Sequence, residues 1–164
     1  MLSSEQAQEL FVFFEKYVSV LYSIAQDEKE KLNSLTSNSL PRIEHAISVA
    51  QANAKQIENF EAKRVSLQAS LGCGDMTLSQ IVEQLPESHT VSVSSLFKQL
   101  EKYVDEIRFI NDKSMSVARD NMARLNPDAP ILQPNEGGAS QNANPYEAAM
   151  SHQNEPQSIF KAKI

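Results

Sequence analysis

Residues 90–125 read TVSVSSLFKQLEKYVDEIRFINDKSMSVARDNMARL. Within this segment, mostly apolar side chains recur in alternating steps of four and three residues. This row comprises Leu96, Leu100, Tyr103, Ile107, Ile110, Ser114, Val117 and Asn121. Such spacing keeps the side chains on one narrow face of a long helix, and a face of this kind packs against partner helices. The segment therefore predicts a long helix, capped at Thr90, whose row of side chains holds a helical bundle together.

A second row lies beside the first, about 100° further round the same predicted helix. It consists of Phe97, Val104, Met115 and Met122. Methionine is flexible and polarizable, and it is common where one surface must fit several apolar partners. Met115 and Met122 favour such a surface, because the first helix is polar or has ended opposite them. For Phe97 and Val104 two interpretations stay open, a place in the bundle core or a place on the partner-binding surface.

Phe109 is a further candidate contact, about 125° from the first row and flanked by charged residues. A single exposed aromatic side chain is common in proteins, so its position alone does not define a site. The full set of candidate partner-binding residues is Phe97, Val104, Phe109, Met115, Ala118, Met122 and Leu125.

The beginning of the chain predicts another long helix, from Ser4 to Leu35, opened by a capping box between Ser3 and Gln6. Its row of side chains comprises Leu10, Phe14, Tyr17, Leu21, Ile24, Glu28, Leu32 and Leu35. The charged residues at 27–31 are interpreted as a solvated face, with Asp27 and Lys31 paired at i,i+4 for a few tenths of a kcal/mol. Glu28 is expected at a solvated end of the bundle.

The break at residues 36–39 is followed by Pro41, which favours the first turn of a second long helix. The row of that helix comprises Ile43, Ile47, Ala50, Ala54, Ile57, Phe60, Leu67 and Leu71. Gly72 suits the position after its end. Thr77 and Gln80 predict a short helix from Leu78 to Leu85, which Pro86 ends and which covers one end of the bundle.

The expected fold for residues 1–125 is therefore an all-α antiparallel bundle of three long helices, with a short fourth helix between the second and third. Residues 126–164 have a different composition, rich in Pro, Asn, Gln and Ser, which predicts a disordered tail. Two short apolar islands interrupt it, at residues 146–150 and at residues 158–164. For Ile159, Phe160 and Ile164, chance hydrophobic residues and a docking segment are both open interpretations.

The composition favours a binding protein over an enzyme. The net charge is −6 with both signs interleaved, which argues against binding nucleic acid or an anionic membrane surface. The single Cys73 excludes a disulfide framework and a thiolate zinc site, and the three histidines lack a ligand at metal spacing. No apolar run is long enough for a signal sequence or a membrane span. We therefore expect a cytoplasmic protein without a cofactor, a metal or catalytic activity.

Residues 10–125 resemble the FlgN-type flagellar type III export chaperones. The resemblance lies in the order long–long–short–long and in four segments: KLNSL at 31–35, IENFEAKRVSL at 57–67, MTLSQIV at 76–82 and RFINDKS at 108–114. The ending with Ile159 and Phe160 is similar to the tails of some members. The second helix differs, since it is rich in Ala and Ile where the family often has Leu, Glu and Lys.

The resemblance implies a cytoplasmic, ATP-independent chaperone. It would bind hook–filament junction (hook-associated) proteins as a monomer or weak dimer, cover their terminal helices, and deliver them to the export gate. An adaptable apolar surface on a long helix fits such a client, whose terminal segments are amphipathic. The alternative is a self-associating coiled-coil scaffold or adaptor with no export role, in which both rows pair with a second copy of the chain.

Overall fold

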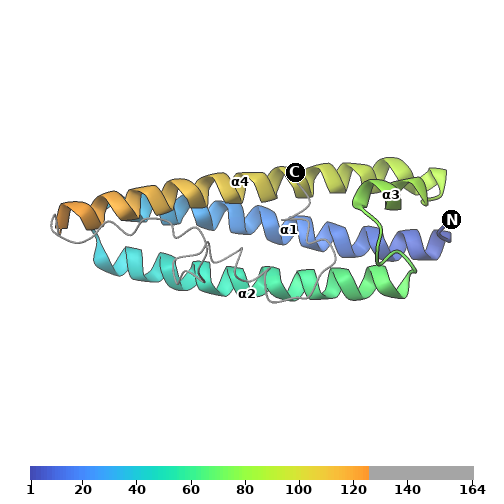
Figure 1. Cartoon of the computed structure of the whole chain (residues 1–164), viewed down its shortest axis with the longest axis horizontal. Helices are drawn as coiled ribbons and strands as arrows, with labels where there is room; N and C mark the ends of the chain where they lie inside the picture. Colours follow the sequence, from blue (N-terminus) through green and yellow to red (C-terminus); the bar gives the residue numbers. More distant parts are fainter. Residues whose placement is uncertain (126–164) are drawn as a thin grey trace.

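The computed structural model describes residues 1–125 of the chain, which form four helices (Figure 1). These are α1 (Ser4–Leu35), α2 (Leu40–Ser70), α3 (Leu78–Glu83) and α4 (Glu87–Leu125). The described part is an all-α bundle, as the sequence predicts. At 1.5 Å per residue, α1 is about 48 Å long and α4 about 58 Å long. The predicted segments at 146–150 and 158–164, including Ile159, Phe160 and Ile164, lie outside the described residues.

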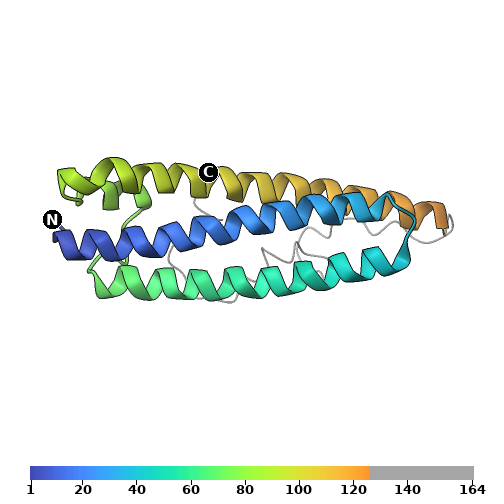
Figure 2. The ribbon, with the colours of Figure 1, turned by 180° about the vertical axis from the view of Figure 1, so that it is seen from behind.

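α1 lies between the other two long helices (Figures 1 and 2). It contacts α4 along one side and α2 along the other, whereas within residues 1–125 the backbones of α2 and α4 do not approach each other closely enough to be in contact. α2 runs antiparallel to α1, and the loop containing α3 returns the chain so that α4 runs parallel to α1 (Figure 1). α1 therefore has two separate interfaces, one with α4 and one with α2.

Of the three predicted N-cap residues, Ser3 and Thr77 cap their helices in the structure, and Thr90 does not. The Ser3 hydroxyl accepts from the Gln6 N–H at 3.2 Å, while the Gln6 side chain accepts from the Ser3 N–H at 2.8 Å. Thr77 and Gln80 form the same reciprocal pair at the start of α3. These bonds satisfy amide groups that the first helical turn leaves without partners.

The start of α4 differs from the prediction, because the helix begins at Glu87 rather than at Thr90. The Thr90 N–H donates to the Pro86 carbonyl at 3.2 Å, and the Thr90 hydroxyl donates to the same oxygen at 3.1 Å. Thr90 is therefore inside the first turn and does not cap it. Pro86 both ends the segment containing α3 and supplies the first carbonyl of α4.

The end of α2 matches the prediction. Gly72 has φ +73°, a left-handed conformation that side chains with a Cβ rarely adopt. The chain then turns into α3, and Ile81 of α3 and Leu85, two residues after its end, are buried against the bundle end. The Leu2 N–H donates to the Gln84 carbonyl at 2.8 Å, and this hydrogen bond holds the first residues of the chain at the same end of the bundle as α3.

The charged second half of α1 corrects the prediction of a solvated face. Glu28 is 0% exposed, and Lys31 is also buried. Lys31 forms an ion pair with Glu28 and donates to the Asn111 side chain of α4 at 2.9 Å. A buried charge is tolerated where it is paired and hydrogen-bonded, and α4 is long enough to cover this half of α1.

Asp27 likewise has a different partner from the one predicted. Its carboxylate accepts from the Asn53 side chain of α2 at 2.9 Å, and Lys31 pairs with Glu28 instead. The predicted row of α2 also needs one correction, because Ile47 is 45% exposed. The buried face of α2 is centred on Ala50, Ala54 and Ile57.

Candidate functional site

Phe97 and Val104, two of the predicted partner-binding residues, belong to the core. They are only 6% and 3% exposed. The Phe97 ring meets the Phe14 ring of α1 edge-on, with centroids 4.6 Å apart. Of the two interpretations that the sequence left open, the core interpretation is correct for both residues, and they are removed from the candidate surface.

The end of α4 carries the exposed members of the predicted set. Asn121 donates to the carbonyl of Leu35, the last residue of α1, at 3.0 Å. Beyond that point α1 offers α4 no further turn, and Met122 and Leu125 are 63% and 86% exposed. Met115 and Ala118 are half-buried on the same side. We call these four residues, Met115, Ala118, Met122 and Leu125, the α4 stripe.

Phe109 does not join the α4 stripe. It is 60% exposed, and the Lys113 ammonium lies 4.4 Å from the centroid of its ring. Thirteen residues separate Phe109 from Met122, which puts them on nearly opposite faces of α4 at about 100° per residue. The cation–π contact with Lys113 stabilises an exposed ring by about 0.5–1 kcal/mol, so Phe109 has a local partner of its own.

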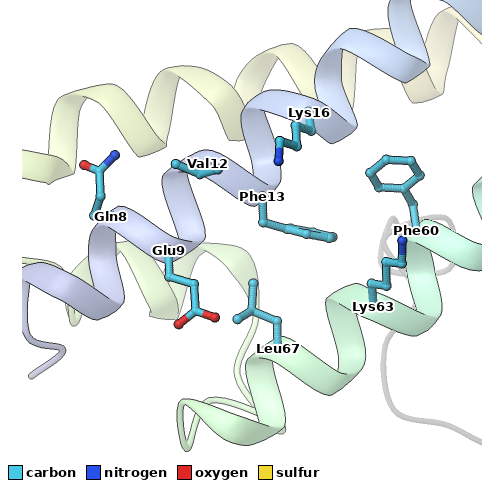
Figure 3. A pocket seen from close by; sticks show the side chains of 8 residues that line it. All are labelled: Gln8, Glu9, Val12, Phe13, Lys16, Phe60, Lys63 and Leu67. Carbon is cyan, nitrogen blue, oxygen red and sulfur yellow. The ribbon is translucent and has the colours of Figure 1, made fainter.

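A groove between α1 and α2 was not predicted from the sequence (Figure 3). It encloses about 510 Å³ and opens to solvent. Its lining residues, which define the α1–α2 groove, are Gln8, Glu9, Val12, Phe13, Lys16, Phe60, Lys63 and Leu67. None of them comes from α4. Val12, Phe13, Phe60 and Leu67 supply apolar surface, and the two lysines and Glu9 supply charge.

Aromatic stacking fixes the floor of the groove. The Phe60 ring stacks on Tyr17 with centroids 5.0 Å apart and lies 6.0 Å from the Phe13 ring. The Lys63 ammonium lies 5.8 Å from the Phe60 centroid. In Figure 3, Lys63 is close to Phe60, whereas Glu9 is close to Leu67. The groove therefore has a basic end and an acidic end above an apolar floor.

A buried polar network lies behind this floor. The Tyr17 hydroxyl donates to Glu61 at 2.8 Å, and the Arg64 guanidinium donates to both Glu61 oxygens at 3.1–3.2 Å. Arg64 also donates to the Gln68 side chain. Burial, and next the Glu61 carboxylate, raise the pKa of Tyr17 well above its ordinary value. Tyr17 thus stays a neutral donor and holds Phe60 in place.

The titratable groups of residues 1–125 are arranged for structure rather than for metal binding. Among these residues, no group of three or more His, Cys, Asp or Glu side chains is placed to hold a metal ion. Cys73 is buried, and its sulfur lies 3.6 Å from the Leu71 carbonyl oxygen. Over the same residues, every helix is too short or too polar to form a membrane span.

Comparisons with protein-family models, with curated proteins and with solved structures gave no match to this chain.

Proposed function

We propose that this chain is a non-catalytic export chaperone. It binds the terminal helices of flagellar hook–filament junction proteins in the cytoplasm, keeps them from assembling, and delivers them to the type III export gate. The observation that carries the proposal is the α4 stripe, an apolar row whose last two members, Met122 and Leu125, are exposed where α4 extends beyond its neighbour α1. The client class comes from the resemblance of residues 10–125 to the FlgN-type chaperones.

The geometry of the α4 stripe suits a helical client. Its four members follow one another at steps of three, four and three residues, which places them along one side of a helix. An amphipathic helix docks through anchors with this same spacing. The stripe is about 15 Å long at 1.5 Å per residue, so it covers roughly three turns of a client. A contact of this size is weak enough to be released at the export gate.

The test is calorimetric binding of the purified full-length chain to the terminal segments of hook–filament junction proteins. We expect binding, and we expect Met122→Glu with Leu125→Glu to weaken it at least tenfold, since each charge would enter an apolar contact. Both side chains are exposed, so helicity measured by circular dichroism should not change. Val91→Glu is the matched control, because Val91 is 79% exposed near the other end of α4.

A wild-type chain that binds none of these segments would refute the chaperone proposal. The self-associating scaffold is the second candidate, since the spacing of the α4 stripe also suits pairing with a copy of itself. Sedimentation velocity separates the two candidates. A tight dimer that dissociates on Met122→Glu with Leu125→Glu favours the scaffold, and a monomer that binds the client segments favours the chaperone.

A further inference from the structure

The α1–α2 groove is separate from the α4 stripe and is not used by the proposed function. We propose that it binds an amphipathic helix of a partner protein whose apolar anchors are flanked by carboxylates. The assignment follows from three properties of the groove: a fixed apolar floor, two lysines without an ion-pair partner, and a length of two helical turns.

The floor is fixed before any partner arrives. Phe60 is stacked on Tyr17, and Tyr17 is held by its hydrogen bond to the buried Glu61. Phe13 packs against both Phe14 and Phe60. Immobilising rotamer-rich side chains opposes binding, so a floor that is already rigid loses little entropy when a partner docks. The floor therefore has the character of a binding surface and not of a loose gap between two helices.

The lysines at the edge of the α1–α2 groove determine which charges on a partner are favoured. Lys16 and Lys63 form no ion pair with any residue of the described part of the chain, although the whole chain has a net charge of −6. Lys29, Lys31 and Lys55 each have a carboxylate partner, and the other lysines of residues 1–125 do not. Lys16 and Lys63 differ from those others in that they line an apolar groove. Two unpaired ammonium groups beside an apolar floor favour a partner with carboxylates at the edge of its apolar face.

The length of the groove sets the spacing of the partner's anchors. Glu9 and Lys16 lie seven residues apart on α1, which corresponds to two turns or about 10 Å. A docked helix of the same length presents apolar anchors at i, i+4 and i+7. Its carboxylates belong at the end near Lys16 and Lys63, away from Glu9 (Figure 3).

The chain's own C-terminal cluster does not have this chemistry. Ile159, Phe160 and Ile164 are accompanied by Lys161 and Lys163. Placed in the groove, that segment would bring two more positive charges next to Lys16 and Lys63, where like charges repel. A second copy of the chain is another candidate occupant, and the experiment below distinguishes it.

The test uses two synthetic helical peptides with leucine at i, i+4 and i+7. One carries glutamates flanking the leucines, and the other carries lysines at the same positions. Fluorescence anisotropy with the full-length chain should give at least tenfold tighter binding for the glutamate peptide, and the difference should shrink as salt rises. Lys16→Glu with Lys63→Glu should reverse the preference. The matched control, Lys55→Glu with Lys98→Glu, changes two exposed lysines outside the groove and should preserve it.

Val12→Glu provides an independent variant, because Val12 is the most exposed apolar residue lining the groove and its replacement leaves the core intact. It should weaken binding of both peptides. The double variant Met122→Glu with Leu125→Glu should bind both peptides as the wild type does. The outcome of the peptide experiment is therefore independent of whether the chaperone proposal holds. Equal binding of the two peptides, no binding of either, or no effect of the lysine reversal overturns the inference. A dimer that dissociates on the lysine reversal also overturns it and makes a second copy the occupant.

Discussion

The side chains that meet α1 from α4 are large and apolar, among them Leu100, Val104 and Ile107. Those that meet it from α2 include the apolar Ile57, but most of the buried ones are alanines and polar groups such as Glu61 and Arg64. Burying apolar area stabilises by about 25 cal/mol per Å² in any register, whereas a hydrogen bond forms only when donor and acceptor are aligned. The α4 side therefore buries more large apolar side chains, and the hydrogen bonds of the α2 side favour one register of α2 against α1.

Phe97→Ala should produce the largest effect, on the α4 side. Removing a buried aromatic side chain leaves a cavity against Phe14, and we expect the free energy of unfolding to fall by about 3–5 kcal/mol. Urea denaturation followed by circular dichroism measures this change. Met122→Ala, on the same helix but exposed, should change it by less than about 0.5 kcal/mol. If the two variants were equally stable, Phe97 would not be a core residue.

Arg64→Met tests the α2 side. The substitution leaves the Glu61 carboxylate buried with the Tyr17 hydroxyl as its remaining donor, and we expect a loss of about 3 kcal/mol. Lys55→Met is the matched control, because Lys55 and Glu58 form an ion pair at the same i,i+3 spacing on the same helix but at the surface. That pair should contribute less than about 0.5 kcal/mol.

Replacing both Glu61 and Arg64 by methionine sharpens the comparison. No buried charge then lacks its partner, but the buried Tyr17 hydroxyl and the Gln68 side chain lose theirs, so only part of the loss should be recovered. Equal losses for Arg64→Met and Lys55→Met would show that burial does not distinguish the two pairs. A double variant as unstable as Arg64→Met would show that the aligned hydrogen bonds themselves contribute the free energy.

Local sequence signals predicted several helix ends, because a cap or a helix stop depends on neighbouring residues. Ser3 with Gln6, Thr77 with Gln80 and the left-handed Gly72 are examples. However, α4 starts at Glu87 rather than Thr90, and α3 ends at Glu83 rather than Leu85. The burial of Glu28 and Lys31 could not be predicted in this way, because it depends on Asn111, which lies 80 residues further along the chain from Lys31. A charged residue is normally exposed, and it is buried only where a partner, here one distant in the sequence, pairs with it.

The α1–α2 groove was not predicted from the sequence for a related reason. Phe60 and Leu67 were assigned to the apolar row of α2, and the apolar arc of α1 is wide enough to include Phe13. Spacing shows that such residues share a face, but the rotation of one helix against the other decides whether that face is closed or open. The hydrogen bond between Tyr17 and Glu61, 44 residues apart, joins α1 to α2 and does not show in the spacing along either helix. The wide apolar arc of α1 was the only local signal of a groove.

Tyr17→Phe gives the smallest of the three effects and adds a pH dependence. At neutral pH the buried Glu61 carboxylate loses one donor, and we expect a loss of about 2 kcal/mol, typical of a hydrogen bond to a charged group. Burial and the Glu61 carboxylate raise the pKa of Tyr17 in the folded state. In the unfolded chain the hydroxyl keeps its ordinary pKa of about 10.

The stabilisation from this shift is fully present below about pH 10, where the hydroxyl is protonated in both states. Above that pH the unfolded chain releases the proton and the folded chain retains it, so wild-type stability falls by at most about 1.4 kcal/mol per pH unit. Tyr17→Phe lacks this loss, and every other ionisable group is present in both proteins. Urea denaturation between about pH 8 and about pH 11 should therefore show the two stabilities converging. Parallel curves would mean that the Tyr17 hydroxyl is exposed to solvent, and that the α2 side is not held in register by its bond to Glu61.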